Sequence, residues 1–182
     1  MKIGIVLGSV RDHRRGGSVA DWILGVTADR TDAEYRLIDL IDFDLPVFSD
    51  AALPATLDKT YDDERVQRFS DELDACDGYV FITAEYNHGI PGAFKNAIDH
   101  VGPELFGKPM AFVSYGAASG VRAVEQWRQV AANFNMFDIR NQVSMSTFTE
   151  FDGETVAPSE RRAAELGQLF DALVPIAERL SA

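Results

Sequence analysis

The chain is poor in the residues that build disulfide frameworks and metal centres. Its 182 residues include one cysteine, Cys76, and three histidines. A single cysteine excludes an internal disulfide framework and a cysteine-rich metal site. No cluster of carboxylates or cysteines accompanies His88 and His100, which disfavours a metal site built on them. We therefore expect no bound metal.

Long apolar runs are also missing. No stretch approaches the roughly 18 apolar residues of a membrane helix, although 46% of the residues are hydrophobic. The first residues, MKIGIVLGS, have the pattern of a strand, without the charged leader or cleavage site of a secretory signal. These features predict a cytoplasmic protein with no membrane partner.

Positive charge is scarce. The chain has 17 Lys and Arg against 29 Asp and Glu, a net charge of −12, and a pI near 4.6. This acidity disfavours nucleic acid as a partner, because phosphate backbones are bound by basic patches. The exception is the stretch Arg11-Asp12-His13-Arg14-Arg15. It is too local for a nucleic-acid footprint and indicates a site for a small anion.

The chain does contain a regular alternation of strand and helix patterns. Apolar runs predict strands at 1–7, 33–40, 79–83, 110–114 and within 139–147, and helical spacing predicts helices at about 19–28, 61–76, 91–101, 121–134 and 159–180. The alternation predicts a single α/β domain over residues 1–182, with a parallel sheet covered on both faces. Right-handed crossovers favour a flavodoxin-like, doubly wound three-layer sandwich with five strands in the order 2-1-3-4-5. Ligands of such sheets bind beyond the carboxyl ends of the strands, between the first and third.

The loop after the first predicted strand, GSVRDHRRGGS, has the features of an anion site. Backbone N–H groups at the start of the next helix favour an anion, and glycines let the backbone approach it. Hydroxyls can donate to it, and arginines can pair with a phosphate bidentately. The residues that we expect at this anion are Ser9, Arg11, Arg14, Gly16, Gly17 and Ser18.

An alternative interpretation of this loop stays open. Ser18 can simply cap the helix, in a box with Asp21, while the arginines are solvated. The loop matches neither G-x-G-x-x-G nor G-x-x-x-x-G-K-[ST]. An ordinary dinucleotide-binding fold or nucleotide triphosphatase is therefore disfavoured.

The loop after the third predicted strand, EYNHGIPG, leads into a helix that begins near Pro91. It offers a flat aromatic ring, an amide and consecutive backbone N–H groups, which suit a planar heterocycle with several ring acceptors. The residues that we expect at this ligand are Glu85, Tyr86, Asn87, His88 and Gly89. Alternatively, Glu85 and Asn87 are plain turn and capping residues.

The loop after the fourth predicted strand, SYGAASG, consists mainly of small residues. They leave room for the edge of a ligand, which Tyr115 can cover, and we expect Ser114, Tyr115 and Gly116 to contact it. The loop does not fit G-x-S-x-G, so a serine-hydrolase elbow is not supported. Cys76 falls at a helix end away from these loops, where a packing role is favoured over a nucleophilic one.

The three loops together resemble a known family. The segments GSVRDHRRGGSVA, EYNHGIPGAFKNAID and SYGAASGVRAVEQWR look like those of the NADPH-dependent FMN reductase family, which includes flavin-dependent quinone and dye reductases. The similarity runs from Met1 to about Arg128. It implies a flavodoxin-like fold that holds FMN non-covalently. The loop from Ser9 to Ser18 would bind the phosphate, Glu85 to Gly89 would border the isoalloxazine ring, and the 114–120 loop would lie along its other side.

Two departures from the family pattern affect this expectation. The family usually has Pro where this chain has Ala84, so the loop after the third strand is expected to be less rigid. Many members have Ser and Asn where Arg14 and Gly16 stand. Phosphate binding would then use different donors. The C-terminal third carries no motif of the family.

The resemblance implies an FMN-dependent oxidoreductase that passes electrons from NADPH or NADH to a small acceptor such as a quinone, dye or free flavin. The flavin supplies the redox chemistry, so we expect no catalytic side chain. Two alternatives stay open. One is a flavodoxin-type electron carrier, whose acidic surface docks on basic partners. The other is a cofactor-free regulatory module of the same fold.

The predicted helix over residues 121–134 also indicates self-association. Its apolar arc is wider than the roughly 100° stripe that packs against a sheet. Arg128 lies within that arc, with no evident partner in the chain. We therefore expect a homodimer or homotetramer with this helix in the interface, as is common among members of the resembled family. The alternative is that the irregular segment 41–60 covers the extra apolar area within one chain.

Overall fold

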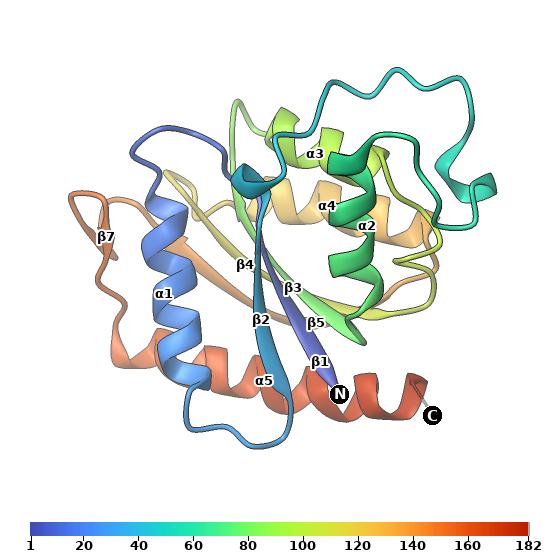
Figure 1. The fold of residues 1–182 in the computed structure, drawn as a ribbon. Coiled ribbons are helices and arrows are strands. Elements are labelled where there is room, and N and C mark those ends of the chain that lie inside the picture. Colours follow the sequence, from blue (N-terminus) through green and yellow to red (C-terminus); the bar gives the residue numbers. More distant parts are fainter. Residues whose placement is uncertain (182) are drawn as a thin grey trace.

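Five parallel strands form the central layer of the protein, whose residues 1–181 are described by a computed structural model (Figure 1). The strand order is β2-β1-β3-β4-β5, and every neighbouring pair is parallel. The strands are β1 (Lys2–Leu7), β2 (Glu34–Asp39), β3 (Gly78–Ala84), β4 (Pro109–Gly116) and β5 (Phe137–Ser146). The predicted fold class and strand order are confirmed.

Helices cover both faces of the sheet (Figure 1). One face carries α1 (Arg15–Thr27) and α5 (Glu160–Leu180), and the other carries α2 (Glu64–Asp74), α3 (Gly92–Asp99) and α4 (Val121–Asn133). The central strands are buried on both faces and alternate between the two cores. In β3, Val80 and Ile82 point toward α1 and α5, whereas Tyr79 and Phe81 point toward α2, α3 and α4. Because these strands are buried on both faces of the sheet, their sequences are continuous apolar runs.

Two features differ from the sequence-based prediction. Helix α1 begins at Arg15, earlier than the expected start near Val19, and its N-cap is Arg14. Ser18 therefore lies inside the helix and does not cap it. A short antiparallel hairpin, β6 (Phe151–Asp152) with β7 (Thr155–Val156), follows β5 and was not predicted. Strands this short carry little periodicity.

The irregular segment 41–60, which contains the second of two 3₁₀ turns (Leu40–Asp42 and Pro54–Thr56), is fastened to α3. Asn96 accepts a hydrogen bond from the backbone N–H of Phe48 at 2.8 Å and donates one to the carbonyl of Pro46 at 2.8 Å. His100 Nε2 lies 2.9 Å from the same carbonyl. These contacts hold the segment over α3.

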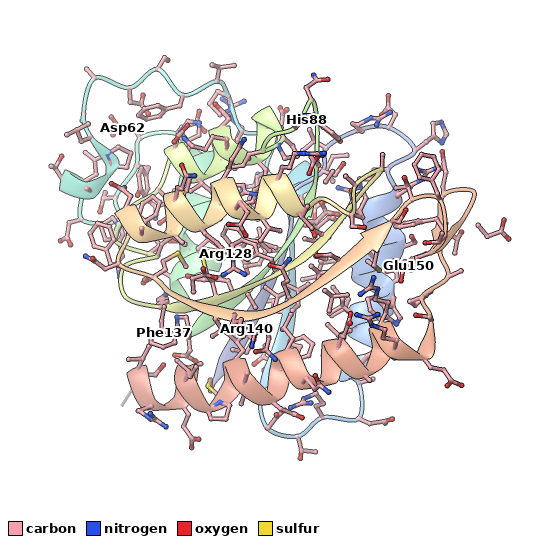
Figure 2. All side chains as sticks on the ribbon, turned by 180° about the vertical axis from the view of Figure 1, so that it is seen from behind. Asp62, His88, Arg128, Phe137, Arg140 and Glu150 are labelled. Atoms are coloured by element: carbon pink, nitrogen blue, oxygen red, sulfur yellow. The ribbon has the colours of Figure 1, made fainter. Side chains whose placement is uncertain are left out.

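Arg128 has partners within its own chain, so the expectation that it lacks one was wrong. Its guanidinium pairs with Asp138 and donates to Gln142 Oε1 at 2.8 Å, while lying 5.5 Å from the centre of the Phe112 ring. Strand β5 is irregular between Asp138 and Gln142, and both partners come from this stretch. Figure 2 shows Arg128 between α4 and β5.

Candidate functional site

A cleft of about 390 Å³ lies at the carboxyl ends of the strands, where the loops after β1, β3 and β4 meet. These are the three loops that the sequence singles out. The hairpin β6–β7 closes one side of the cleft, and the loop after β5 also contributes. The lining residues are Ser9, Arg11, His13, Arg14, Arg15, Ala84, Glu85, Tyr86, Tyr115, Gly116, Ala117, Thr147 and Glu154.

Helix α1 presents an open N-terminus at this cleft. Arg14 supplies no side-chain cap, and within residues 1–181 the first-turn N–H groups have no hydrogen-bond partner outside the helix. A Cβ on Gly16 would lie 2.7 Å from the Tyr115 hydroxyl, so only glycine fits there, while a Cβ on Gly17 would meet nothing within 4 Å. Free N–H groups and the helix dipole make this terminus suitable for an anion.

The arginines around this terminus have different surroundings. Arg14 forms a bidentate pair with Asp39, at the end of β2, and donates to the carbonyl of Ser9 at 2.6 Å. The guanidinium of Arg11 lies 5.8 Å from the centre of the Tyr86 ring. Arg15 donates only to a backbone carbonyl and stacks on an aromatic ring. Among the described residues Arg11 and Arg15 form no ion pair, and both remain available to an anion.

A tight turn follows β3 at the edge of the cleft. Tyr86 and Gly89 exchange two backbone hydrogen bonds, of 3.1 and 3.0 Å, and both residues between them have positive φ, 51° at Asn87 and 66° at His88. Two such residues in succession define a type I′ turn, which Asn favours. The side chains of Asn87 and His88 are exposed, and Figure 2 shows His88 at the tip of the turn. Tyr86 remains the residue of this turn that lines the cleft.

Helix α4 holds the loop after β3 in place. Gln126 accepts a hydrogen bond from the backbone N–H of Ile90 at 3.1 Å and donates one to the carbonyl of His88 at 3.1 Å. Glu85 accepts from the backbone N–H of Arg122 at 2.9 Å and from its guanidinium at 2.5 Å. The loops after β3 and β4 are therefore fixed relative to each other at the cleft.

Tyr115 and Ser114 lie deep beneath the cleft. Tyr115 lines it while remaining almost completely buried, and this burial raises the pKa of its phenol to about 12. Ser114 is fully buried, and its hydroxyl donates to the carbonyl of Ser119 at 2.8 Å. Ser114 thus supports the loop after β4 from below.

The structure brings the predicted site residues to one edge of the sheet but gives them different positions. Those that line the cleft are Ser9, Arg11, Arg14, Glu85, Tyr86, Tyr115 and Gly116. Gly16, Gly17 and Gly89 shape its backbone, whereas Ser18 hydrogen-bonds to the hairpin β6–β7. Sequence reasoning missed His13, Arg15, Ala117, Thr147 and Glu154 as lining residues. The basic run was a usable signal for His13 and Arg15, but nothing indicated Glu154.

Cys76 lies outside this site. Its thiol is 1% exposed and donates a weak hydrogen bond to the carbonyl of Glu72 at 3.3 Å. Burial raises its pKa to about 11, so the thiol stays protonated and poorly nucleophilic near neutral pH. Among residues 1–181, no group of three or more His, Cys, Asp or Glu is arranged to hold a metal ion, and no helix is long and apolar enough to cross a membrane.

A doubly wound sheet with an open helix N-terminus at its switch point defines a protein of the flavodoxin-like class. Residues 1–150 match the sequence model of NADPH-dependent FMN reductases, and the chain belongs to that family. The family assignment from the three motifs is confirmed.

Individual relatives agree with this assignment. The chain is 39% identical over 129 residues to the NAD(P)H-dependent FMN reductase ntnL of Nectria sp, covering 69% of this chain and 64% of that protein. It is 34% identical over 135 residues to the NAD(P)H-dependent FMN reductase C4B3.06c of Schizosaccharomyces pombe, covering 74% and 68%. The solved structure of FerB, a flavoenzyme NAD(P)H:(acceptor) oxidoreductase from Paracoccus denitrificans, shares the fold with a TM-score of 0.74 at 21% identity, over 98% of both chains.

Proposed function

We propose that the cleft holds FMN non-covalently, and that the protein passes electrons from NADPH or NADH to a small acceptor such as a quinone, dye or free flavin. The observation that carries this proposal is the open N-terminus of α1 beside Arg11 and Arg15. Such a concentration of unpaired donors and cations is unexpected in a chain of net charge −12 unless an anion binds there. A terminal phosphate has the charge and acceptor oxygens that this site requires.

The residues present fit FMN. The phosphate is assigned to the N–H groups of Gly16 and Gly17, with Arg11 as a charged donor, and Arg14 holds the loop in shape through Asp39. The ring system is assigned to the wall built from Tyr86 and its type I′ turn on one side. The loop from Tyr115 to Ala117 would lie on the other side. This assignment retains the predicted site. Arg14, Ser18 and Ser114 contribute to it indirectly, through their hydrogen bonds to Asp39, the hairpin β6–β7 and Ser119.

FMN, when bound, would supply the redox chemistry of the reaction. The chain's own contribution is binding and orientation. Arg11 and the N-terminus of α1 would hold the phosphate, and the Glu85–Arg122 pair fixes the distance between the two loops at the ring. No side chain is assigned a catalytic proton transfer.

The visible spectrum of the purified protein tests the proposal, followed by anaerobic mixing with NADPH. We expect flavin bands that bleach on mixing and return when a quinone is added. Double-reciprocal plots of the steady-state rate against NADPH concentration, recorded at several quinone concentrations, should give parallel lines. This pattern is expected because the donor and the acceptor have to use the same cleft in turn. A colourless protein that cannot be reconstituted with FMN would overturn the proposal.

The same experiment separates the enzyme from a flavodoxin-type electron carrier. A carrier would show the flavin bands, but it would oxidise NADPH negligibly without a partner enzyme. Membership of the FMN reductase family favours the enzyme.

We further propose that the active protein is a homodimer or homotetramer formed through α3 and α4. The support is a groove of about 840 Å³ between these helices, lined in part by Ile90, Val130 and Phe134. Val121 on α4 is 39% exposed, so part of the apolar arc is uncovered within one chain. A cytoplasmic location stays a prediction.

A further inference from the structure

The hairpin β6–β7 is fixed against the start of α1. Its two-residue turn consists of Gly153, with a φ of 60°, and Glu154. Arg15 Nε donates to the carbonyl of Gly153 at 3.0 Å. The Ser18 hydroxyl accepts from the backbone N–H of Val156 at 2.9 Å, and its one proton is shared between the carbonyls of Arg15, at 2.8 Å, and Glu154, at 3.1 Å. The tip of the hairpin is thereby held beside the free N–H groups of the helix.

This placement brings an acidic side chain to the cationic end of the cleft. Two carboxylates line the cleft, Glu85 and Glu154. Glu85 is 7% exposed and is neutralised by Arg122. The side chain of Glu154 is 60% exposed and, among residues 1–181, forms no ion pair with an arginine or lysine; Nδ1 of His13 lies 4.0 Å from its carboxylate. A carboxylate without an arginine or lysine partner therefore lines the same cleft as the proposed phosphate position.

We propose that Glu154 is a specificity-determining residue that restricts the cleft to flavins ending in a single phosphate. The inference rests on the proposed function, because it takes the flavin phosphate to bind at the N-terminus of α1. FMN ends at that phosphate. FAD continues through a second phosphate to an adenosine, and the hairpin that carries Glu154 is fixed beside the helix terminus, so we expect the longer ligand to pass its carboxylate. Like charges repel, and a repulsion that acts on one ligand more than on another discriminates between ligands that share the rest of their structure.

The hairpin and Glu154 lie outside the residues that match the family model, which end at 150. Of this device, the three motifs that identify the family contain only Ser18. Its components are the two-residue turn, the anchor Ser18 and the carboxylate. Ser18 therefore anchors the hairpin, a role that differs from the phosphate contact and the helix cap expected from the sequence.

The test compares flavin affinities of wild type, Glu154→Gln and Asp152→Asn. Asp152 is exposed, belongs to the same hairpin and does not line the cleft, so its variant removes one charge as a matched control. FMN, FAD and riboflavin are titrated into the flavin-free protein by fluorescence quenching at low ionic strength. We expect Glu154→Gln to lower the ratio of the FAD to the FMN dissociation constant about three- to tenfold, an effect that salt diminishes. The riboflavin dissociation constant of Glu154→Gln should equal that of wild type. The FAD-to-FMN ratio of Asp152→Asn should also equal that of wild type.

The outcomes are distinguishable. An unchanged FAD-to-FMN ratio in Glu154→Gln, or an equal gain for both ligands, would refute the role of Glu154 while leaving FMN binding intact. A further variant, Glu154→Ala, separates charge from size: a ratio that falls in Glu154→Ala but not in Glu154→Gln would show that side-chain size and not charge discriminates, which also contradicts the inference. If wild type binds none of the three flavins, the proposed function itself fails. Coincident thermal unfolding curves of the variants would confirm that each is folded.

Discussion

Arg11 and Arg14 lie three positions apart in one basic run, yet their surroundings differ. Arg14 is pinned between Asp39 and the carbonyl of Ser9, and its side chain is 17% exposed. Arg11 is exposed, has no ion pair among the described residues and lies over Tyr86. Arg14 thus supports the loop, whereas Arg11 is free to bind a ligand.

Replacing Arg11 by Ala should weaken FMN strongly and riboflavin hardly at all. Loss of a charged hydrogen bond amounts to about 1.5–3 kcal/mol, or roughly a ten- to hundredfold rise in the dissociation constant of FMN. Fluorescence titration of both flavins measures the effect. Arg140→Ala is the matched control, since Arg140 is exposed on the edge strand far from the cleft (Figure 2). Equal weakening of FMN and riboflavin would show that Arg11 does not bind the phosphate.

Tyr115 should make the protein less stable in alkali. Burial raises its pKa from 10.0 to about 12, so above pH 10 the unfolded state releases a proton that the folded state retains. The free energy of unfolding therefore falls as pH rises from about 10 to 12, by up to about 2–3 kcal/mol from this group. Urea unfolding at pH 8, 10 and 11 should show a shallower decline in Tyr115→Phe than in wild type. Identical declines would contradict this assignment.

At the scale of elements, the cleft is made of loops that other elements hold in place. The turn from Tyr86 to Gly89 has no regular structure beyond one pair of backbone bonds, and α4 fixes it through Gln126. The loop after β1 is similarly fixed by β2 through Asp39. A ligand site built this way is ordered before the ligand arrives, which reduces the entropy lost on binding.

Gln126→Ala should loosen the turn after β3 without unfolding the protein. The two lost hydrogen bonds contribute about 1–3 kcal/mol together, mainly to local order. Hydrogen exchange of residues 86–90 should accelerate and FMN should bind more weakly, while the midpoint of thermal unfolding changes little. Gln129→Ala is the control on the same helix, because no turn bond depends on Gln129. If hydrogen exchange of residues 86–90 is the same in Gln126→Ala as in wild type, Gln126 does not position the turn.

At the scale of the whole molecule, the open question concerns the outer face of α3 and α4. Arg128 turns inward to β5 and so gives no support to an interface. The groove between the two helices remains, and it borders the turn at Ile90 that belongs to the cleft wall. A second copy covering this groove would also shield one side of the flavin site.

Light scattering at micromolar concentration should give the mass of a dimer or tetramer. Val130→Glu, which puts a charge into the groove, should shift the protein toward monomer and weaken flavin binding. Phe137→Glu is the control, since Phe137 is 52% exposed on the edge strand and lies outside the groove (Figure 2). Arg128→Glu would not test the interface alone, because it would also break the ion pair with Asp138 within the chain. A wild-type monomer that is flavin-loaded and fully active would refute self-association.

The architecture and the location of the cleft follow from the amino-acid sequence alone. Apolar periodicity is a local property, and the preference for right-handed crossovers turns a list of elements into one strand order. The three loops at the carboxyl edge follow from that order, as does the family from their motifs. Residues such as Tyr86 and Arg11 could therefore be placed at the site from their loops alone.

Which polar groups meet depends on how distant segments of the chain pack together. Arg14 pairs with Asp39, 25 residues away, and Arg15 reaches Gly153 across 138 residues. Arg128 found its partners on an irregular stretch of β5, and Ser18 became the anchor of a hairpin too short to predict. Long polar side chains take whichever partners packing brings within about 3 Å, and no periodicity records that choice. The sequence thus determined where the cleft lies, and the packing of distant segments decided which of its charges remain free to bind a ligand.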